Sequence, residues 1–342
     1  MPYVDGLSFL PEDLAQLSES GLNAFALDVS GSEMSTDSSG ATVMTRSFEA
    51  SLRSMTETRR LLKESKGVAF LATRGSEIAQ AASENRTAVF FQLQGGGEVV
   101  GQELWRLGTL HELGLSVFQL THHFDNPLAG GGLEKHCSGL TELGKQAVER
   151  LDALGMIPDL SHASDLTARD VLKTSRRPVI VSHGAARKLC HNPRCTPDEL
   201  IRGIADSGGV FGIFMMSFWL TSDPVPRVEH LIAQIRHVIN VGGSGAVGIA
   251  NDYPITGEAH LRALGNDNAE GVKAYHPWWT SIRARGVAGF EELPKHVVIP
   301  ELNDVRRMHT IRAALERARF TSSEIEKIMG GNWVRVLTDV LG

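Results

Sequence analysis

Cysteine is scarce in this sequence, and the few cysteines are not spaced for a structural role. The 342 residues include three, Cys137, Cys190 and Cys195, and no two of them form a Cys-x-x-Cys motif. Neither a disulfide framework nor a zinc knuckle is therefore indicated. No apolar run is long enough to span a membrane, so we expect no membrane partner. Residues 1–6 lack the basic and apolar regions of a signal peptide, and we expect a cytoplasmic protein.

Clusters of basic residues are also missing. The formal net charge is −6 at pH 7, and without a basic cluster we expect no nucleic acid partner. We find no repeat of the solenoid type and no low-complexity tract. Hydrophobic residues make up 42% of the chain, which is enough to form a buried core, and 342 residues fit one large α/β barrel or two smaller domains.

The sequence does contain a regular alternation of strand-like and helix-like segments. Such an alternation indicates parallel βα units. The strand-like segments are residues 3–8, 23–29, 87–94, 115–121, 156–161, 178–182, 209–215 and 246–250. The helical segments between them include residues 48–65, 101–113, 140–154, 197–207 and 228–241. Eight such units predict an α/β fold of the (βα)8, or TIM, barrel type.

The other segments extend this barrel without adding a second domain. Residues 67–73 form a further strand-like run, which we assign to an excursion between the second and third barrel strands. Residues 256–300 are rich in Gly, Trp, His and Pro, and predict a long loop region over the barrel mouth. Residues 301–342 predict extra C-terminal helices, at 304–318 and 322–341, that cover the barrel. We therefore expect a single barrel domain over residues 1–342.

Two histidines stand at matching positions, each at the carboxyl end of a predicted strand. The strand at 156–161 follows a helix that ends at Gly155 and leads into His162, and the strand at 178–182 leads into His183. Barrels of this type carry their chemistry at the carboxyl ends of the strands. A structural histidine is the simpler interpretation of either residue alone, but the matched pair favours a functional site.

Other polar residues follow the remaining strands. They are Gln94 after the third strand, His122 after the fourth, Asp252 after the eighth and, in the loop after the sixth, Arg194. Because neutral imidazole and carboxylate groups suit zinc and similar ions, His162, His183 and Asp252 form a candidate metal set. His122 would add a donor for an oxyanion, and Arg194 would clamp a carboxylate.

Each of these residues also has a simpler interpretation. Asp252 could be a helix N-cap, and Arg194 could be a solvated loop arginine. His122 and His123 are adjacent, so on a regular strand only one of them faces the barrel axis. The glycines at 95–97 lack the Lys-Ser/Thr of a phosphate cradle and predict a turn that allows close backbone approach. The shared location at strand ends is what favours a site.

These stretches resemble the renal (membrane) dipeptidase family, peptidase family M19, over essentially the whole chain. The resemblance rests on residues 4–6, 120–122, 139–145, 154–164, 178–183, 193–194, 247–252 and 329–333. The Asp-Leu-Ser-His element followed by the Pro-Val-Ile-Val-Ser-His element is its most specific part. The resemblance implies a (βα)8 barrel of the amidohydrolase superfamily, a homodimer, and two zinc ions bridged by a hydroxide that attacks a dipeptide bond.

The chain departs from this family at three metal-ligand positions. The family's Asp-Gly-His-x-Asp reads Asp-Gly-Leu-Ser-Phe here, so Leu7 and Phe9 replace two ligands. Gln94 stands where the family has a bridging glutamate. The positions that the resemblance retains are His162 and His183 at the second zinc, Asp252 near the first, and His122 and Arg194 on the substrate side.

The departures remove two negative charges from the metal cluster. Two divalent ions a few ångströms apart repel each other, and anionic ligands are what make such a pair tolerable. We therefore expect at most one zinc ion, on His162, His183 and Asp252, with an empty site as the alternative.

These observations predict a dipeptidase-like hydrolase of dipeptides or related small amides with a free carboxylate. In this scheme Asp252 carries the proton and His122 stabilises the oxyanion. The substrate is bound by Arg194, His122 and Gln94. Two alternatives remain: a metal-independent enzyme that acts on a small amino-acid derivative, and a catalytically inactive barrel that binds such a ligand.

Overall fold

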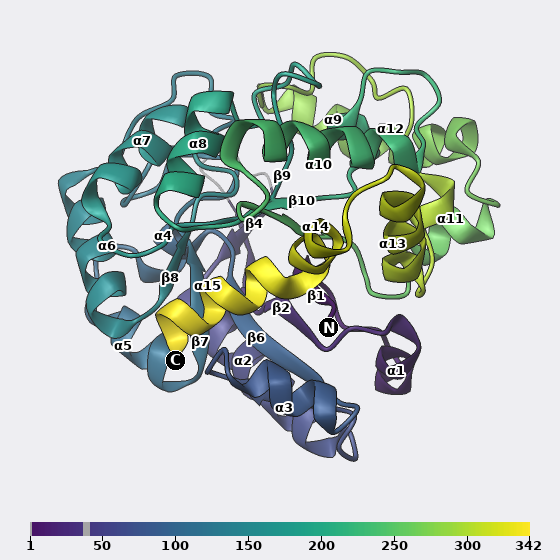
Figure 1. Cartoon of the computed structure of the whole chain (residues 1–342). Coiled ribbons are helices and arrows are strands. Elements are labelled where there is room, and N and C mark those ends of the chain that lie inside the picture. The colour runs from purple at the N-terminus through teal and green to yellow at the C-terminus, as the bar shows by residue number, and fades with distance from the viewer. Residues whose placement is uncertain (1, 37–41) are drawn as a thin grey trace.

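A ring of eight parallel strands forms the centre of the molecule (Figure 1). The computed structural model describes residues 2–36 and 42–342. The ring strands are β1 (Val4–Ser8), β2 (Ala24–Asp28), β6 (Thr87–Leu93), β7 (Leu115–Gln119), β8 (Ile157–Asp159), β9 (Val181–Gly184), β10 (Phe211–Ile213) and β11 (Val247–Ile249). Their order is β8-β7-β6-β2-β1-β11-β10-β9, and a parallel bridge from Asp159 to Ile180 closes the ring. The predicted (βα)8 barrel is confirmed, and each predicted barrel strand corresponds to one of these eight.

The strands are short and apolar because both of their faces are covered. All seven residues of β6 and all five of β1 are buried. Parallel strands with helices on the outside and packed side chains on the inside have this composition. The barrel interior is consequently a packed core, and polar side chains concentrate at its carboxyl end.

Helices surround the ring. They are α1 (Leu17–Ser20), α2 (Phe48–Glu64), α3 (Glu77–Ser83), α4 (Gly96–Val100), α5 (Trp105–Glu112), α6 (Glu142–Leu154), α7 (Asp165–Thr174), α8 (Asp198–Asp206), α9 (Ser217–Leu220) and α10 (Val228–Gly242). Hydroxyl caps set two of the starts, because Thr141 accepts from the backbone N–H of Gly144 in α6 and Ser164 accepts from that of Thr167 in α7. The helix expected at 101–113 corresponds to α5, which begins only at Trp105, and the short α4 lies before the expected range. No helix in the described part of the chain is long and apolar enough to cross a membrane.

Two additions follow β2. An antiparallel pair of β3 (Ser32–Thr36) and β4 (Thr42–Arg46) comes first, and it was not predicted from the sequence. The second is β5 (Ala69–Ala72), which pairs with the first half of β6 while β7 pairs with the second half. The strand-like run at 67–73 is therefore an excursion between the second and third barrel strands, as predicted.

The segment from 256 to 300 was predicted to be a long loop region, and this is wrong for much of its length. It contains α11 (Ala259–Ala263) and the longer α12 (Asn268–Ala284). Asp267 starts α12 by accepting hydrogen bonds from the backbone N–H groups of Ala269 and Glu270, and Trp279 anchors it in the core. Pro277 lies within α12, where it is tolerated although proline usually ends a helix.

The C-terminal segment closes the amino end of the barrel. It contains a short 3-10 turn (Pro300–Leu302), α13 (Arg307–Arg317), α14 (Ser322–Glu326), a π-type turn (Lys327–Gly331) and α15 (Asn332–Leu341). The single helix expected at 322–341 is thus broken near Gly330. Trp333 of α15 donates from Nε1 to the Ile249 carbonyl at 2.9 Å and lies so close to Gly6 that a Cβ there would clash. Figure 1 shows α15, in yellow, lying across the strands. The other end of the barrel is left for a site.

Candidate active site

His162 and His183 meet at the carboxyl ends of β8 and β9. Their Nε2 atoms lie 2.9 Å apart, and both residues are buried. His162 has a φ of 65°, in the left-handed region that a histidine rarely adopts, so the backbone is bent to aim this ring. The structure therefore brings together the two histidines that the sequence singled out.

His122 and His123 both join this cluster. The ring of His122 stacks on His162 at a centroid distance of 4.3 Å, and the ring of His123 lies 5.0 Å from His162. We expected only one of the two adjacent histidines to face the barrel axis. That expectation is wrong because β7 ends at Gln119, and the chain after it no longer alternates as a strand does. His123 is the residue that the sequence analysis missed, although the His-His doublet was visible.

Three of the imidazoles are close enough to share one ion. Within the described residues, ligand atoms of His122, His123 and His162 lie within 4.8 Å of one another. The buried Nδ1 atoms of His123 and His162 have no hydrogen-bond partner there. Burial, and to a lesser extent the positive charge of Arg194, lowers the pKa of all four histidines, and the pKa of His123 falls to about 3. The rings are consequently neutral, which is the form that binds a metal.

A buried polar network beneath His183 fixes its tautomer. Ser182 Oγ donates its single proton to Asp159 Oδ2 at 2.6 Å, and it lies 2.8 Å from His183 Nδ1. Since the serine proton is already used, His183 Nδ1 must be the donor in the second contact. Gln92 and Ser161 complete the network by donating to the Asp159 carboxylate. His183 Nε2 is left with a free lone pair that points into the site.

Arg194 is buried beside these histidines. Its residue exposure is 5%, and its Nη2 donates to the His183 carbonyl at 3.1 Å. The guanidinium carbon lies 5.2 Å from the Phe214 ring and 5.6 Å from the Trp219 ring. The alternative of a solvated loop arginine is therefore wrong.

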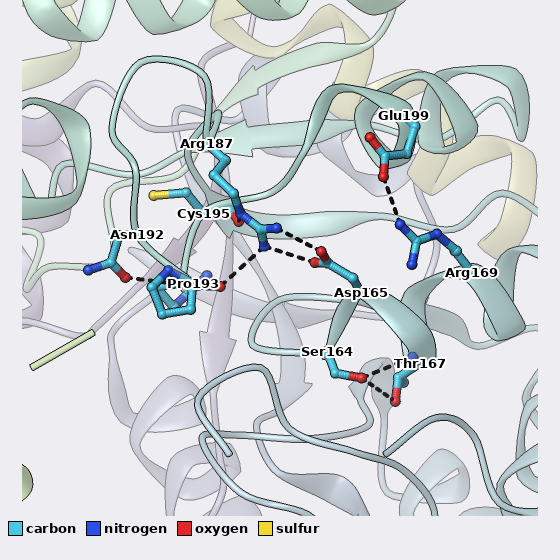
Figure 2. A network of polar contacts seen from close by, with 10 residues as sticks. Ser164, Asp165, Thr167, Arg169, Arg187, Asn192, Pro193, Cys195 and Glu199 are labelled. Carbon is cyan, nitrogen blue, oxygen red and sulfur yellow. Dashed lines mark hydrogen bonds and ion pairs between the residues drawn. The ribbon is translucent and has the colours of Figure 1, made fainter. Parts of the chain in front are cut away.

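The loop that carries Arg194 is held on both sides of it by Arg187 (Figure 2). Arg187 donates to the carbonyls of Cys195 at 2.8 Å and Pro193 at 3.4 Å. Its other contacts are two parallel hydrogen bonds to the Asp165 carboxylate, at 2.7 and 2.8 Å. This bidentate pair ties the loop to the start of α7.

Asp252 follows β11 with a φ of 56°, so its backbone is also in the left-handed region. Its N–H donates to the Leu7 carbonyl at 2.9 Å. Burial raises the pKa of its carboxyl to about 7, and the charge of Arg194 opposes that shift. The alternative of a helix N-cap is wrong, because α11 begins only at Ala259. Among the described residues, Asp252 is not part of a three-ligand group with the histidines.

Comparison with known proteins bears directly on this site. Residues 9–267 match the membrane dipeptidase family, peptidase family M19. The chain belongs to this family. Dipeptidase 3 of Macaca fascicularis is 30% identical to it over 269 residues, which cover 74% of this chain and 55% of that protein. The chain thus spans about half the length of that relative.

Solved structures agree on the fold. An amidohydrolase from Pseudomonas aeruginosa superposes with a TM-score of 0.83 at 23% identity, covering 100% of this chain and 97% of that one. A metallopeptidase from Rhodobacter sphaeroides, liganded with a phosphinate mimic of the dipeptide L-Ala-D-Ala, gives a TM-score of 0.77 at 15% identity, covering 99% of each chain. At these identities the likeness establishes the shared barrel.

Three positions at which the resemblance leads one to expect metal ligands carry other residues in this member of the dipeptidase family. Leu7 is fully buried in β1, and the backbone N–H of Phe9 donates to the Tyr253 carbonyl at 3.3 Å. Gln94 is buried, and its backbone N–H donates to Asp28 Oδ1 at 3.1 Å. The neutral histidine cluster therefore fits a zinc ion.

Proposed function

We propose that this member of the membrane dipeptidase family is a hydrolase of dipeptides or related small amides that carry a free carboxylate, with at most one zinc ion per chain. The observation that carries the proposal is Arg194. Among the described residues its buried Nε has no hydrogen-bond partner and its guanidinium forms no ion pair, although the charge of the Asp252 carboxyl acts on it. A buried cation is costly unless an anion neutralises it, and a substrate carboxylate would supply that anion.

Two assignments of the zinc ligands remain. The distances favour His122, His123 and His162, whereas the sequence-based set is His162, His183 and Asp252. When bound, zinc would supply Lewis-acid polarisation of the substrate and an activated water. A metal count on His123→Gln and Asp252→Asn separates the two sets, since only the variant that removes a true ligand should lose the ion.

The chain's own residues would perform the remaining steps. A carboxyl with a pKa of about 7, such as Asp252, can accept a proton from water and return it to the leaving amine at neutral pH. Arg194 would hold the substrate carboxylate, and Gln94 would bind the substrate from the end of β6. His122 would donate to the oxyanion if it is not a zinc ligand.

A substrate panel tests this proposal. Dipeptides should be cleaved, and the same dipeptides with an amidated C-terminus should be cleaved far more slowly, because the amide cannot pair with Arg194. Equal rates for both forms would contradict the role of the carboxylate. No cleavage of any dipeptide by zinc-loaded protein would contradict the hydrolase itself.

A metal-independent enzyme acting on a small amino-acid derivative is the second candidate. It is favoured by the loss of ligands at Leu7, Phe9 and Gln94 while Arg194 stays. Activity that survives complete chelation of metal would support it, and activity restored only by zinc would exclude it. An inactive ligand-binding barrel would instead show saturable binding without turnover. A homodimer in the cytoplasm also stays a prediction, and light scattering tests the dimer.

A further inference from the structure

Cys190 and Cys195 lie in one loop beside the candidate active site, and each thiol influences the pKa of the other. They also reach consecutive carbonyls of α9: Cys190 Sγ lies 3.8 Å from the Phe218 oxygen and Cys195 Sγ lies 3.4 Å from the Trp219 oxygen. Neither cysteine forms a disulfide in the structure.

This loop is closed at its base and contains Arg194. The Arg187 N–H donates to the Thr196 carbonyl at 2.9 Å, and the Thr196 N–H donates to the Ala185 carbonyl at 2.8 Å. Arg194 immediately precedes Cys195, whose carbonyl Arg187 also binds (Figure 2). A new covalent bond inside the loop would therefore act on the segment that presents Arg194.

The two thiols are not equivalent. Cys190 lines a cavity of about 330 Å³ together with His191, Thr221 and His296, which gives a small oxidant access to its sulfur. Cys195 is almost fully buried. The neighbouring Cys195 thiol lowers the pKa of the Cys190 thiol, whereas Cys190 and burial raise the pKa of the Cys195 thiol. Since the thiolate is the nucleophile, Cys190 is the reactive member and Cys195 the resolving one.

We propose that Cys190 and Cys195 are an oxidation site, at which hydrogen peroxide converts the thiol pair to a disulfide and thereby loosens the loop that carries Arg194. The Cys190 thiol gives its proton to solvent, and its sulfur attacks a peroxide oxygen. The O–O bond breaks, and the hydroxide that leaves takes up a proton as water. The Cys195 sulfur then attacks the sulfenic sulfur and displaces hydroxide, which takes the Cys195 proton as a second water. Two thiols are oxidised, and one hydrogen peroxide is reduced.

The disulfide should loosen the loop because it replaces the contacts that the two thiols make with α9. The disulfide removes both S–H groups, so the contacts to the Phe218 and Trp219 carbonyls lose their donors. It also fixes the two sulfurs about 2 Å apart, which shifts the loop that holds them. Trp219 is one of the two aromatic rings beside Arg194, so the surroundings of the guanidinium change with it.

Mass spectrometry tests the oxidation in the full-length protein. Cys137 is exposed, so the Cys137→Ser protein serves as the reference. After hydrogen peroxide, unfolding and alkylation, we expect Cys190 and Cys195 to be protected together in one cross-linked peptide and to be released by dithiothreitol. In Cys195→Ser, Cys190 should stop at sulfenic or higher acids, and in Cys190→Ser, Cys195 should stay reduced. Both thiols remaining open to alkylation after peroxide would overturn the proposal.

Hydrogen exchange tests the consequence for the loop without any need for activity. In the oxidised protein, the amides of residues 185–197 and of α9 should exchange several-fold faster than in the reduced protein, and reduction should reverse the change. Unchanged exchange in protein whose disulfide is proven by mass would overturn the link to Arg194. Because neither readout uses turnover, a failure of the proposed hydrolase would be seen separately.

Discussion

His162 Nε2 and His183 Nε2 lie 2.9 Å apart at the tips of two neighbouring strands. Ser182 holds the proton of His183 on Nδ1, so the Nε2 of His183 offers a lone pair. Without an ion, His162 must donate from Nε2, which leaves the buried Nδ1 of His162 without a partner. Such an arrangement suits a metal ion, which can bind several imidazole lone pairs at once.

Removing the hydroxyl that orients His183 should weaken zinc binding. Ser182→Ala deletes the acceptor for His183 Nδ1, and changes of this kind cost about 10–100-fold in metal affinity. Ser161→Ala is the matched control, because Ser161 also donates to Asp159 but contacts only the backbone N–H of His183. Competition titration with a zinc chelator measures both. Equal affinities in the two variants would show that the tautomer of His183 is not fixed through Ser182.

Replacing Arg194 by lysine should weaken binding of a carboxylate ligand although the charge is kept. A lysine cannot form two parallel hydrogen bonds, and the loss should be about 1.5–3 kcal/mol, the range for hydrogen bonds to charged groups. The exposed Arg202→Lys should change the binding free energy by less than about 0.5 kcal/mol. Calorimetric titration with a dipeptide or an uncleaved analogue is the measurement. If Arg194→Lys binds as tightly as wild type, Arg194 is not the clamp.

Arg187→Lys should weaken the same carboxylate binding only by changing the position of Arg194. The lysine cannot serve the Cys195 and Pro193 carbonyls together with Asp165, so Arg194 loses its support on both sides. We expect KM to rise about fivefold, as for the loss of roughly one hydrogen bond, with kcat little changed. Arg169→Lys, in the neighbouring exposed pair with Glu199 (Figure 2), should leave both constants unchanged. A fall in kcat with constant KM would argue against positioning.

The buried Asp5 should make the fold less stable as the pH rises from about 4 to 6. Burial raises the pKa of its carboxyl from 3.8 to about 6, so over this range the unfolded chain releases the proton first. The contribution of Asp5 to the free energy of unfolding is thus fully present below the pKa of Asp5 in the unfolded chain. It is lost as the pH rises through the pKa of Asp5 in the folded protein, and it amounts to roughly 3 kcal/mol. Asp5→Asn should remove this contribution, so the difference in unfolding free energy between Asp5→Asn and wild type should change with pH over this range, whereas the exposed Asp206→Asn should run parallel to wild type. Denaturant unfolding at several pH values gives the free energies, and an Asp5→Asn curve parallel to that of wild type would contradict the assignment.

The barrel and the meeting of His162 with His183 could be predicted because they depend on local pattern. Short apolar runs alternating with helical periodicity specify the βα units, and equivalent strand ends must lie at the same rim. The set of metal ligands could not be predicted from local pattern in the same way. It depends on where β7 stops, and the end at Gln119 frees both His122 and His123 to turn inward.

The remaining differences come from contacts between distant parts of the chain. The helix α12 forms where glycine, proline and aromatic content favoured a loop, because Trp279 is buried against other loop residues such as Phe290. The burial of Arg194 was also beyond local reasoning, since Phe214, Trp219 and the Arg187–Asp165 pair come from three other segments.

The central claim is a histidine site that holds at most one zinc ion, and metal counting tests it most directly. Full-length protein should be saturated with zinc, freed of loosely bound metal and measured by plasma mass spectrometry against protein concentration. We expect no more than about one ion per chain, and we expect His162→Gln to lose whatever ion is bound. Two tightly held ions per chain would contradict it.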